Sequence, residues 1–172
     1  AVVRFGERKP LIYFKELEPI AGQITIGTGC IGSPVGKNIL TGRKDLAIQW
    51  DVCIEMIAWD GRWPNSPSFA GMEQVFAANF ATLGAAVPTA VELGFHLCYG
   101  DLDAKHFVQP IDATKLVEMA NLITRSVRRP INWVHMPVPI DRADDAYFAP
   151  LKELQLQPGT ELYLGLVHVQ DG

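Results

Sequence analysis

The chain has 172 residues, of which 48% are hydrophobic and 20% charged, and this composition is typical of one globular domain. Its formal net charge of −4 at pH 7 argues against a broad surface for nucleic acid or for an anionic membrane. Its 3 cysteines suit a reducing compartment, and no apolar run approaches the roughly 20 residues of a membrane span. We therefore expect a cytoplasmic protein with no nucleic-acid or membrane partner.

We expect residues 1–44 to form an irregular N-terminal segment. A short strand is predicted at Gln23–Ile26, and the glycine-rich stretch Gly27–Gly36 follows it. The glycine spacing matches the dinucleotide-binding motif, but that motif needs a helix whose N-terminus opens at the glycines. Pro34 and Gly36 both oppose such a helix. We therefore predict an irregular glycine-rich loop at this position instead of a nucleotide site.

From residue 45 onward, apolar strands alternate with amphipathic helices. The predicted strands cover residues 46–52, 91–98, 131–136 and 162–168, and the predicted helices cover residues 69–86, 113–128 and 143–154. Pro150 is expected to kink or split the last helix. Alternating strands and helices are typical of a parallel sheet with right-handed crossovers. We therefore predict one α/β domain over residues 45–172.

Polar side chains lie toward the carboxyl end of each predicted strand. They are Asp51, His96 with Cys98, His135 and His168. The carboxyl ends of parallel strands meet at one edge of a sheet or barrel, where active sites are built. His96 and Cys98 are two residues apart, so a strand would present both on one face, and imidazole with thiol is a pair that binds zinc. The alternative is a core cysteine beside a hydrogen-bonded histidine.

Three segments, residues 46–51, 94–101 and 133–137, resemble the cobalamin-independent methionine synthase superfamily. The closer resemblance is to its short members, which are described as similar to uroporphyrinogen decarboxylase and methionine synthase. It covers residues 45–172 and implies the C-terminal part of a (β/α)8 barrel of the TIM type. Four or five strands cannot close an eight-stranded barrel, so we expect a partial barrel. The methionine synthases of this superfamily use zinc to bind a thiol substrate as thiolate, which then takes a methyl group from a folate.

The resemblance also implies a set of site residues. His96 and Cys98 fall on two zinc ligands of the family, and His135 lies where the family has a glutamate ligand. The family's fourth ligand is a cysteine beyond residue 172, and Cys53 would replace it best if the first strand continued past Asp51. Asp51 falls on the acid that holds the amino group of the thiol substrate. We assign catalytic roles to Asp51, His135 and Asp101, and substrate binding to Asp51, Trp50, Tyr99 and His168.

The expected function is zinc-assisted methyl transfer to a small-molecule thiol, with a folate-type methyl donor. One alternative is a metal-free lyase like the decarboxylase branch of the superfamily. A second alternative is a catalytically inactive partial barrel that acts as a binding or assembly module. A partial barrel exposes apolar surface, so we expect the chain to self-associate or to pair with a missing barrel half.

Overall fold

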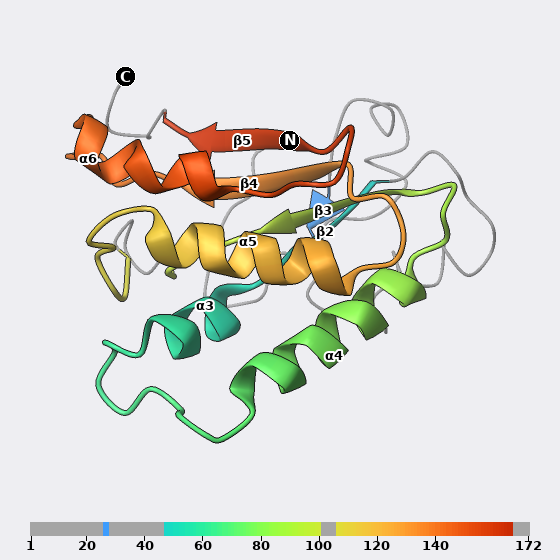
Figure 1. Cartoon of the computed structure of the whole chain (residues 1–172), viewed down its shortest axis with the longest axis horizontal. Coiled ribbons are helices and arrows are strands. Elements are labelled where there is room, and N and C mark those ends of the chain that lie inside the picture. Colours follow the sequence, from blue (N-terminus) through green and yellow to red (C-terminus); the bar gives the residue numbers. More distant parts are fainter. Residues whose placement is uncertain (1–25, 28–46, 101–105, 167–172) are drawn as a thin grey trace, which may run out of the picture.

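The computed structural model describes residues 26–27, 47–100 and 106–166, which form a parallel β-sheet with helices (Figure 1). The strands are β1 (Ile26–Gly27), β2 (Ala47–Asp51), β3 (Glu92–His96), β4 (Trp133–Pro137) and β5 (Glu161–Gly165). The helices are α3 (Cys53–Asp60), α4 (Met72–Ala86), α5 (Thr114–Ser126), α6 (Asp145–Phe148) and the short 3-10 helix η2 (Ala149–Glu153). The five strands lie in the sheet in chain order, and every neighbouring pair is parallel.

The predicted α/β fold and the parallel order of the four main strands are therefore confirmed. Strand β3 ends at His96, before the predicted end at residue 98, so Cys98 follows the strand instead of belonging to it. Strand β5 likewise ends at Gly165, before the predicted end at residue 168. Pro150 lies in η2 and separates this 3-10 segment from α6, as expected of a residue without a backbone N–H. The predicted glycine-rich loop lies outside the described residues, apart from Gly27 in β1.

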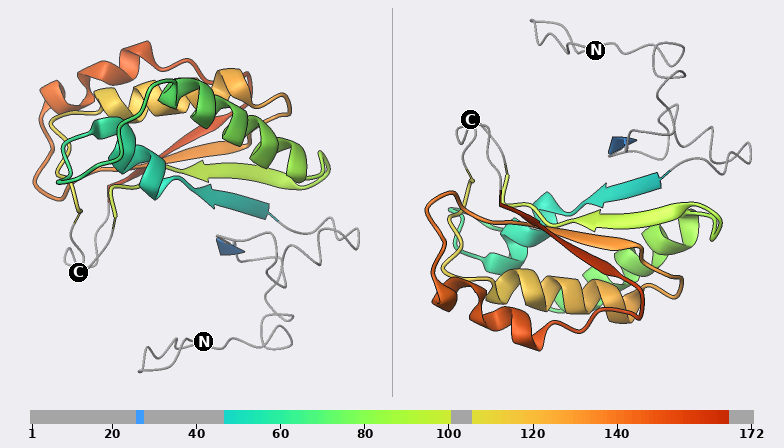
Figure 2. Two further views of the ribbon diagram at one scale, coloured as in Figure 1. Left: turned by 90° about the horizontal axis from the view of Figure 1, so that it is seen from below. Right: turned by 90° about the horizontal axis from the view of Figure 1, so that it is seen from above.

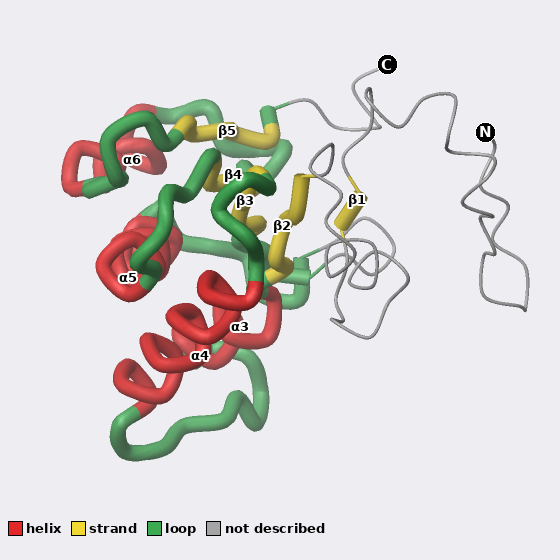
Figure 3. Tube along the Cα trace, turned by 90° about the vertical axis from the view of Figure 1, so that its right-hand side faces the viewer, coloured by secondary structure: helices red, strands yellow, loops and turns green. Residues whose placement is uncertain are grey.

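The helices lie on one face of the sheet (Figures 2 and 3). Alternate residues of β2 to β5 point toward them, and these side chains form the core with residues of α4 and α5. Phe95 of β3, for example, packs edge-to-face against Phe80 of α4 at a centroid distance of 6.1 Å. The intervening strand residues lie on the opposite face, which no described helix covers. None of the described helices has the length and apolar character needed to cross a bilayer.

Helix α3 is not predicted from the sequence, and the structure adds it directly after β2. It has 8 residues, too few to show a clear helical period, and it buries Met56, Ile57 and Ala58. Gly61 ends it in the left-handed conformation at φ 74°, with its N–H donated to the Ile57 carbonyl oxygen. This short helix decides where the side chains beyond Asp51 are placed.

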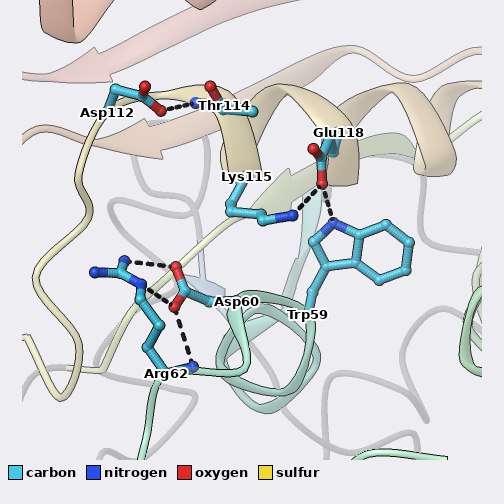
Figure 4. A network of polar contacts seen from close by, with 7 residues as sticks. All are labelled: Trp59, Asp60, Arg62, Asp112, Thr114, Lys115 and Glu118. Carbon is cyan, nitrogen blue, oxygen red and sulfur yellow. Dashed lines mark hydrogen bonds and ion pairs between the residues drawn. The ribbon is translucent and has the colours of Figure 1, made fainter.

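Polar contacts fix the end of α3 against the start of α5 (Figure 4). The Trp59 indole N–H donates to Oε2 of Glu118 over 2.8 Å, and Lys115 Nζ contacts the same oxygen over 2.8 Å. Next to them, the guanidinium of Arg62 binds both carboxylate oxygens of Asp60 at 2.6 and 2.7 Å. These contacts hold α3 in one orientation, and so they also hold Cys53 at its other end.

Gly94 of β3 lies under the indole ring of Trp133, whose N–H donates to Gln49 Oε1 over 2.7 Å. A Cβ atom at this position would lie 2.0 Å from Trp133 Cε2, so Gly94→Ala has to displace the ring. We expect this variant to lose about 1–3 kcal/mol of unfolding free energy in urea denaturation. Gly165→Ala is the control, because its nearest atom would be His135 Nε2 at 3.3 Å. Equal losses in the two variants would contradict the packing argument.

Candidate metal centre

The chain turns sharply where β2 ends. This turn places the Cys53 sulfur close to the Cys98 sulfur, which follows the carboxyl end of β3. Asp51 is the last residue of β2 and pairs with His96, the last residue of β3. The Val52 N–H continues this pairing by donating to the His96 carbonyl oxygen over 2.9 Å. Cys53 then begins α3, and its N–H donates to Asp51 Oδ1 over 3.0 Å. The Asp51 carboxylate is thereby held next to the first turn of the helix.

Among the described residues, Asp51, Cys53 and Cys98 bring three metal-binding side chains together. Their ligand atoms all lie within 4.8 Å of one another. Asp51 is exposed, and both cysteines are half-buried. Cys98 Sγ accepts the N–H of Gly100 over 3.2 Å, and Gly100 has the left-handed φ of 86° that favours glycine. The chain thus turns between Cys98 and Gly100 and directs the Gly100 N–H to the Cys98 sulfur.

We compared this donor set with the requirements of zinc. Zinc binds thiolate and carboxylate at about 2.0–2.3 Å, so two donors of a tetrahedral ion lie roughly 3–4 Å apart. Donor atoms within 4.8 Å of one another reach that arrangement with small side-chain rotations. Three protein ligands also leave a fourth position open, as in catalytic zinc sites. Asp51, Cys53 and Cys98 therefore fit a zinc ion.

The surroundings of Cys53 disfavour its thiolate form. Burial, together with the negative charges of Cys98 and Asp51, raises the pKa of the Cys53 thiol to about 12. Without a cation, Cys53 is therefore protonated at neutral pH. A bound metal ion reverses this preference, because its positive charge stabilises the thiolate. Metal binding at this group should therefore release a proton from Cys53.

His96 and His135 form a pair beside the candidate metal centre. Their Nδ1 atoms lie 2.8 Å apart, so one nitrogen donates and the other accepts, and the rings are stacked at a centroid distance of 4.7 Å. Burial lowers the pKa of both imidazoles, and the neighbouring His96 lowers that of His135 further. Asp51 opposes the shift at His96. The strand register places Asp51, His96, His135 and Tyr163 in one row across β2 to β5.

The structure places the predicted site residues in different surroundings. The predicted ligands His96, Cys98 and His135 do not gather as one group among the described residues. The histidines contact each other, whereas Cys98 joins Asp51 and Cys53. The reason is that β3 ends before Cys98, so the alternation that pairs His96 with Cys98 does not extend that far. Asp51 lies in the candidate metal centre itself.

Trp50 and Tyr99, predicted to bind substrate, are core residues with exposures of 7% and 0%. Trp50 precedes Asp51 within β2, so its side chain points to the opposite face of the sheet. Asp101 and His168 lie outside the described residues. The sequence favours Cys53 as a substitute ligand only if the first strand continues past Asp51. Strand β2 ends at Asp51, so the start of α3, and not strand alternation, brings Cys53 into the group. The signal that identifies it is the spacing Asp51-x-Cys53, read together with a helix start at Cys53.

The histidine pair should make the metal-free protein less stable in mild acid. Because folding lowers both histidine pKa values, the unfolded chain binds more protons below the ordinary histidine pKa, near 6.5. The stability is fully present above that pH and falls as the pH drops from about 7 to about 5. Urea denaturation with a chelator across this range measures the effect. His135→Gln should flatten the dependence, and an unchanged slope would contradict the assignment.

Comparisons with protein-family models, with curated proteins and with solved structures find no match. The resemblance to the methionine synthase superfamily therefore rests on the sequence segments that carry it, and the site is argued from its own geometry.

Proposed function

We propose that the chain binds zinc through Asp51, Cys53 and Cys98 and transfers an alkyl group, such as methyl, to a small-molecule thiol. The observation that carries this proposal is the convergence of one carboxylate and two sulfurs within 4.8 Å at the carboxyl ends of β2 and β3. When bound, zinc would supply the positive charge that keeps a substrate sulfur as thiolate at neutral pH, the form that attacks an alkyl donor.

The protein's own residues would prepare the substrate. The imidazoles of His96 and His135 are kept neutral by burial, so the pair can accept the proton that a thiol loses. The short contact between their Nδ1 atoms lets one ring stabilise the charge on the other. In this proposal Asp51 is a metal ligand and not the amino-group anchor that the resemblance implies. His135 keeps the catalytic role assigned from the sequence.

A cavity on the same face of the sheet would hold the rest of the substrate. It has a volume of 580 Å³ and extends from Tyr163, the register partner of His135, toward the amino ends of β3 and β5, where Glu92 and Glu161 begin these strands. Its described lining is polar and aromatic: Gln49, Glu92, Asn132, Trp133, Gly159, Glu161 and Tyr163. Two carboxylates and no basic side chain in this lining favour a thiol that carries a cationic group, such as an amine.

The sheet also fits part of a (β/α)8 barrel. Parallel strands in chain order with helices on one face are the arrangement of such a barrel. We propose that further strands complete it, either from a second copy of this chain or from a separate barrel half. Light scattering at micromolar concentration tests this, and a stable monomer would argue against pairing between copies.

Alkylation kinetics test the proposed function. The zinc-loaded chain is mixed with a small aminothiol and either a folate-type methyl donor or a simple alkyl halide, and the alkylated thiol is quantified by mass spectrometry. We expect product formation that a chelator abolishes and that Cys98→Ser loses, whereas Cys30→Ser retains it. Equal rates with and without chelator would contradict the proposal. Lyase activity without metal would favour the decarboxylase-like alternative, and an inactive chain that still assembles would favour the binding module.

A further inference from the structure

Cys53 and Cys98 are also a pair of neighbouring thiols. Neither forms a disulfide in the structure, both are half-buried, and their sulfurs lie within 4.8 Å of each other. They come from different elements, because Cys53 begins α3 and Cys98 lies in the loop after β3. Two accessible thiols at this separation have a chemistry that does not depend on metal.

The geometry favours a direct bond between the two sulfurs. A disulfide has a sulfur–sulfur length of about 2.05 Å, so the sulfurs have to approach each other by less than about 3 Å. Neither cysteine lies in the middle of a regular element, where closing this distance would break several backbone hydrogen bonds. Cys53 is the first residue of its helix, and Cys98 belongs to a loop that turns at Gly100. Movement at these two positions therefore leaves the middle of each regular element undisturbed.

We propose that Cys53 and Cys98 form a reversible disulfide when the protein meets a low-molecular-weight disulfide of the glutathione type. The bond would remove two of the three donors that hold the metal, so oxidation would release zinc and reduction would restore the site. The release of metal rests on the proposed function, whereas formation of the bond does not.

The exchange proceeds in two balanced steps. The Cys98 thiolate, whose sulfur accepts the Gly100 N–H, attacks one sulfur of the reagent, forming a mixed disulfide and releasing one reagent thiolate. Cys53 loses its proton to solvent and attacks the Cys98 sulfur, which releases the second reagent thiolate. Both thiolates take up protons from water. The two protein thiols are thus oxidised by two electrons in total, and the reagent disulfide is reduced to two thiols.

Peptide mapping of the metal-free chain tests the bond. The full chain is stripped with a chelator, treated with oxidised glutathione, quenched by alkylation and analysed by mass spectrometry. We expect a Cys53–Cys98 bridged peptide, a mass loss of two hydrogens and no retained glutathione on Cys98. Cys53→Ser should trap the glutathione adduct on Cys98, and Cys30→Ser should bridge as the parent does. A glutathione adduct that stays on Cys98 of the parent chain, or a disulfide that includes Cys30, would overturn the proposal. The peptide map of the parent chain is sufficient to detect either outcome.

A second arm follows the metal. The zinc-loaded chain is oxidised in the presence of a chromophoric zinc indicator and then reduced. Zinc should appear in solution in proportion to the bridged peptide and return to the protein after reduction. Bridging without zinc release would overturn the regulatory part of the proposal. A chain that binds no zinc contradicts the proposed function instead, and the metal-free map still decides whether the thiols pair.

Discussion

Replacing Arg129 by methionine is expected to lower the free energy of unfolding by about 2–5 kcal/mol, because each buried carbonyl left without a donor costs about 1–3 kcal/mol. Arg129 is only 8% exposed, and its guanidinium donates to three backbone carbonyls of the segment between α4 and β3. Nη1 contacts the Val87 and Pro88 oxygens at 2.8 and 2.7 Å, and Nη2 contacts the Val91 oxygen at 2.5 Å. Methionine fills a similar volume but removes the donor to all three oxygens. The Pro88 oxygen keeps the Val91 N–H at 2.9 Å, so the cost falls mainly on the Val87 and Val91 oxygens.

The neighbouring residue provides a matched control for this variant. Arg128 has the same side chain and is exposed, so Arg128→Met should change the unfolding free energy by no more than about 0.5 kcal/mol. Both variants are compared with the parent by urea denaturation at neutral pH, where the difference in midpoint gives the loss. Similar losses for the two arginines would show that the carbonyl contacts of Arg129 contribute little to stability.

The second large effect concerns zinc affinity. Cys53→Ser and Cys98→Ser each remove a sulfur donor. Substituting a residue that only supports the ligands costs up to about 100-fold in metal affinity, so we expect each of these variants to lose more than about 100-fold in zinc affinity. His96→Ala should keep the affinity within about tenfold of the parent, because His96 contacts His135 instead of joining the donor group. The ligand set implied by the family resemblance predicts the opposite ranking for Cys53 and His96.

Competition with a chromophoric chelator measures these affinities. The metal-free variants are first compared with the parent by circular dichroism, so that a loss of fold is distinguished from a loss of metal. A similar loss in His96→Ala and Cys98→Ser, with Cys53→Ser unchanged, would support the ligand set taken from the resemblance. It would contradict the centre at Asp51, Cys53 and Cys98.

The parallel sheet was predictable from the sequence because its strands are apolar runs with clear ends. The strand β4, for instance, ends at the Pro137 that limits its hydrophobic run, and the register of β3 and β4 brings His96 and His135 together as their positions suggest. What the sequence could not supply is the short helix α3. Its 8 residues follow a strand without a proline or glycine between them, so the break at Asp51 leaves no local signal.

This missing helix explains the incomplete prediction of the site. A strand that continued past Asp51 would include Cys53 as a further strand residue. In the structure α3 begins at Cys53 and brings its sulfur to Asp51 and Cys98. Arg129 shows the same limit at a different place. Its position after a helix suggests a favourable interaction with the helix dipole, but α5 ends at Ser126 and the guanidinium turns to the carbonyls of another segment. Tertiary contacts of this kind have no periodic pattern in the sequence.

Cobalt spectroscopy tests the central claim most directly, because it counts the sulfurs bound to the metal. Co²⁺ occupies zinc sites, and each bound thiolate adds charge-transfer absorption in the near ultraviolet. The metal-free parent titrated with Co²⁺ should show the intensity of two thiolates, Cys53→Ser and Cys98→Ser that of one, and Cys30→Ser that of two. Parent absorption that is equal to that of Cys53→Ser, or a parent with no thiolate band, would contradict a metal centre built from Asp51, Cys53 and Cys98.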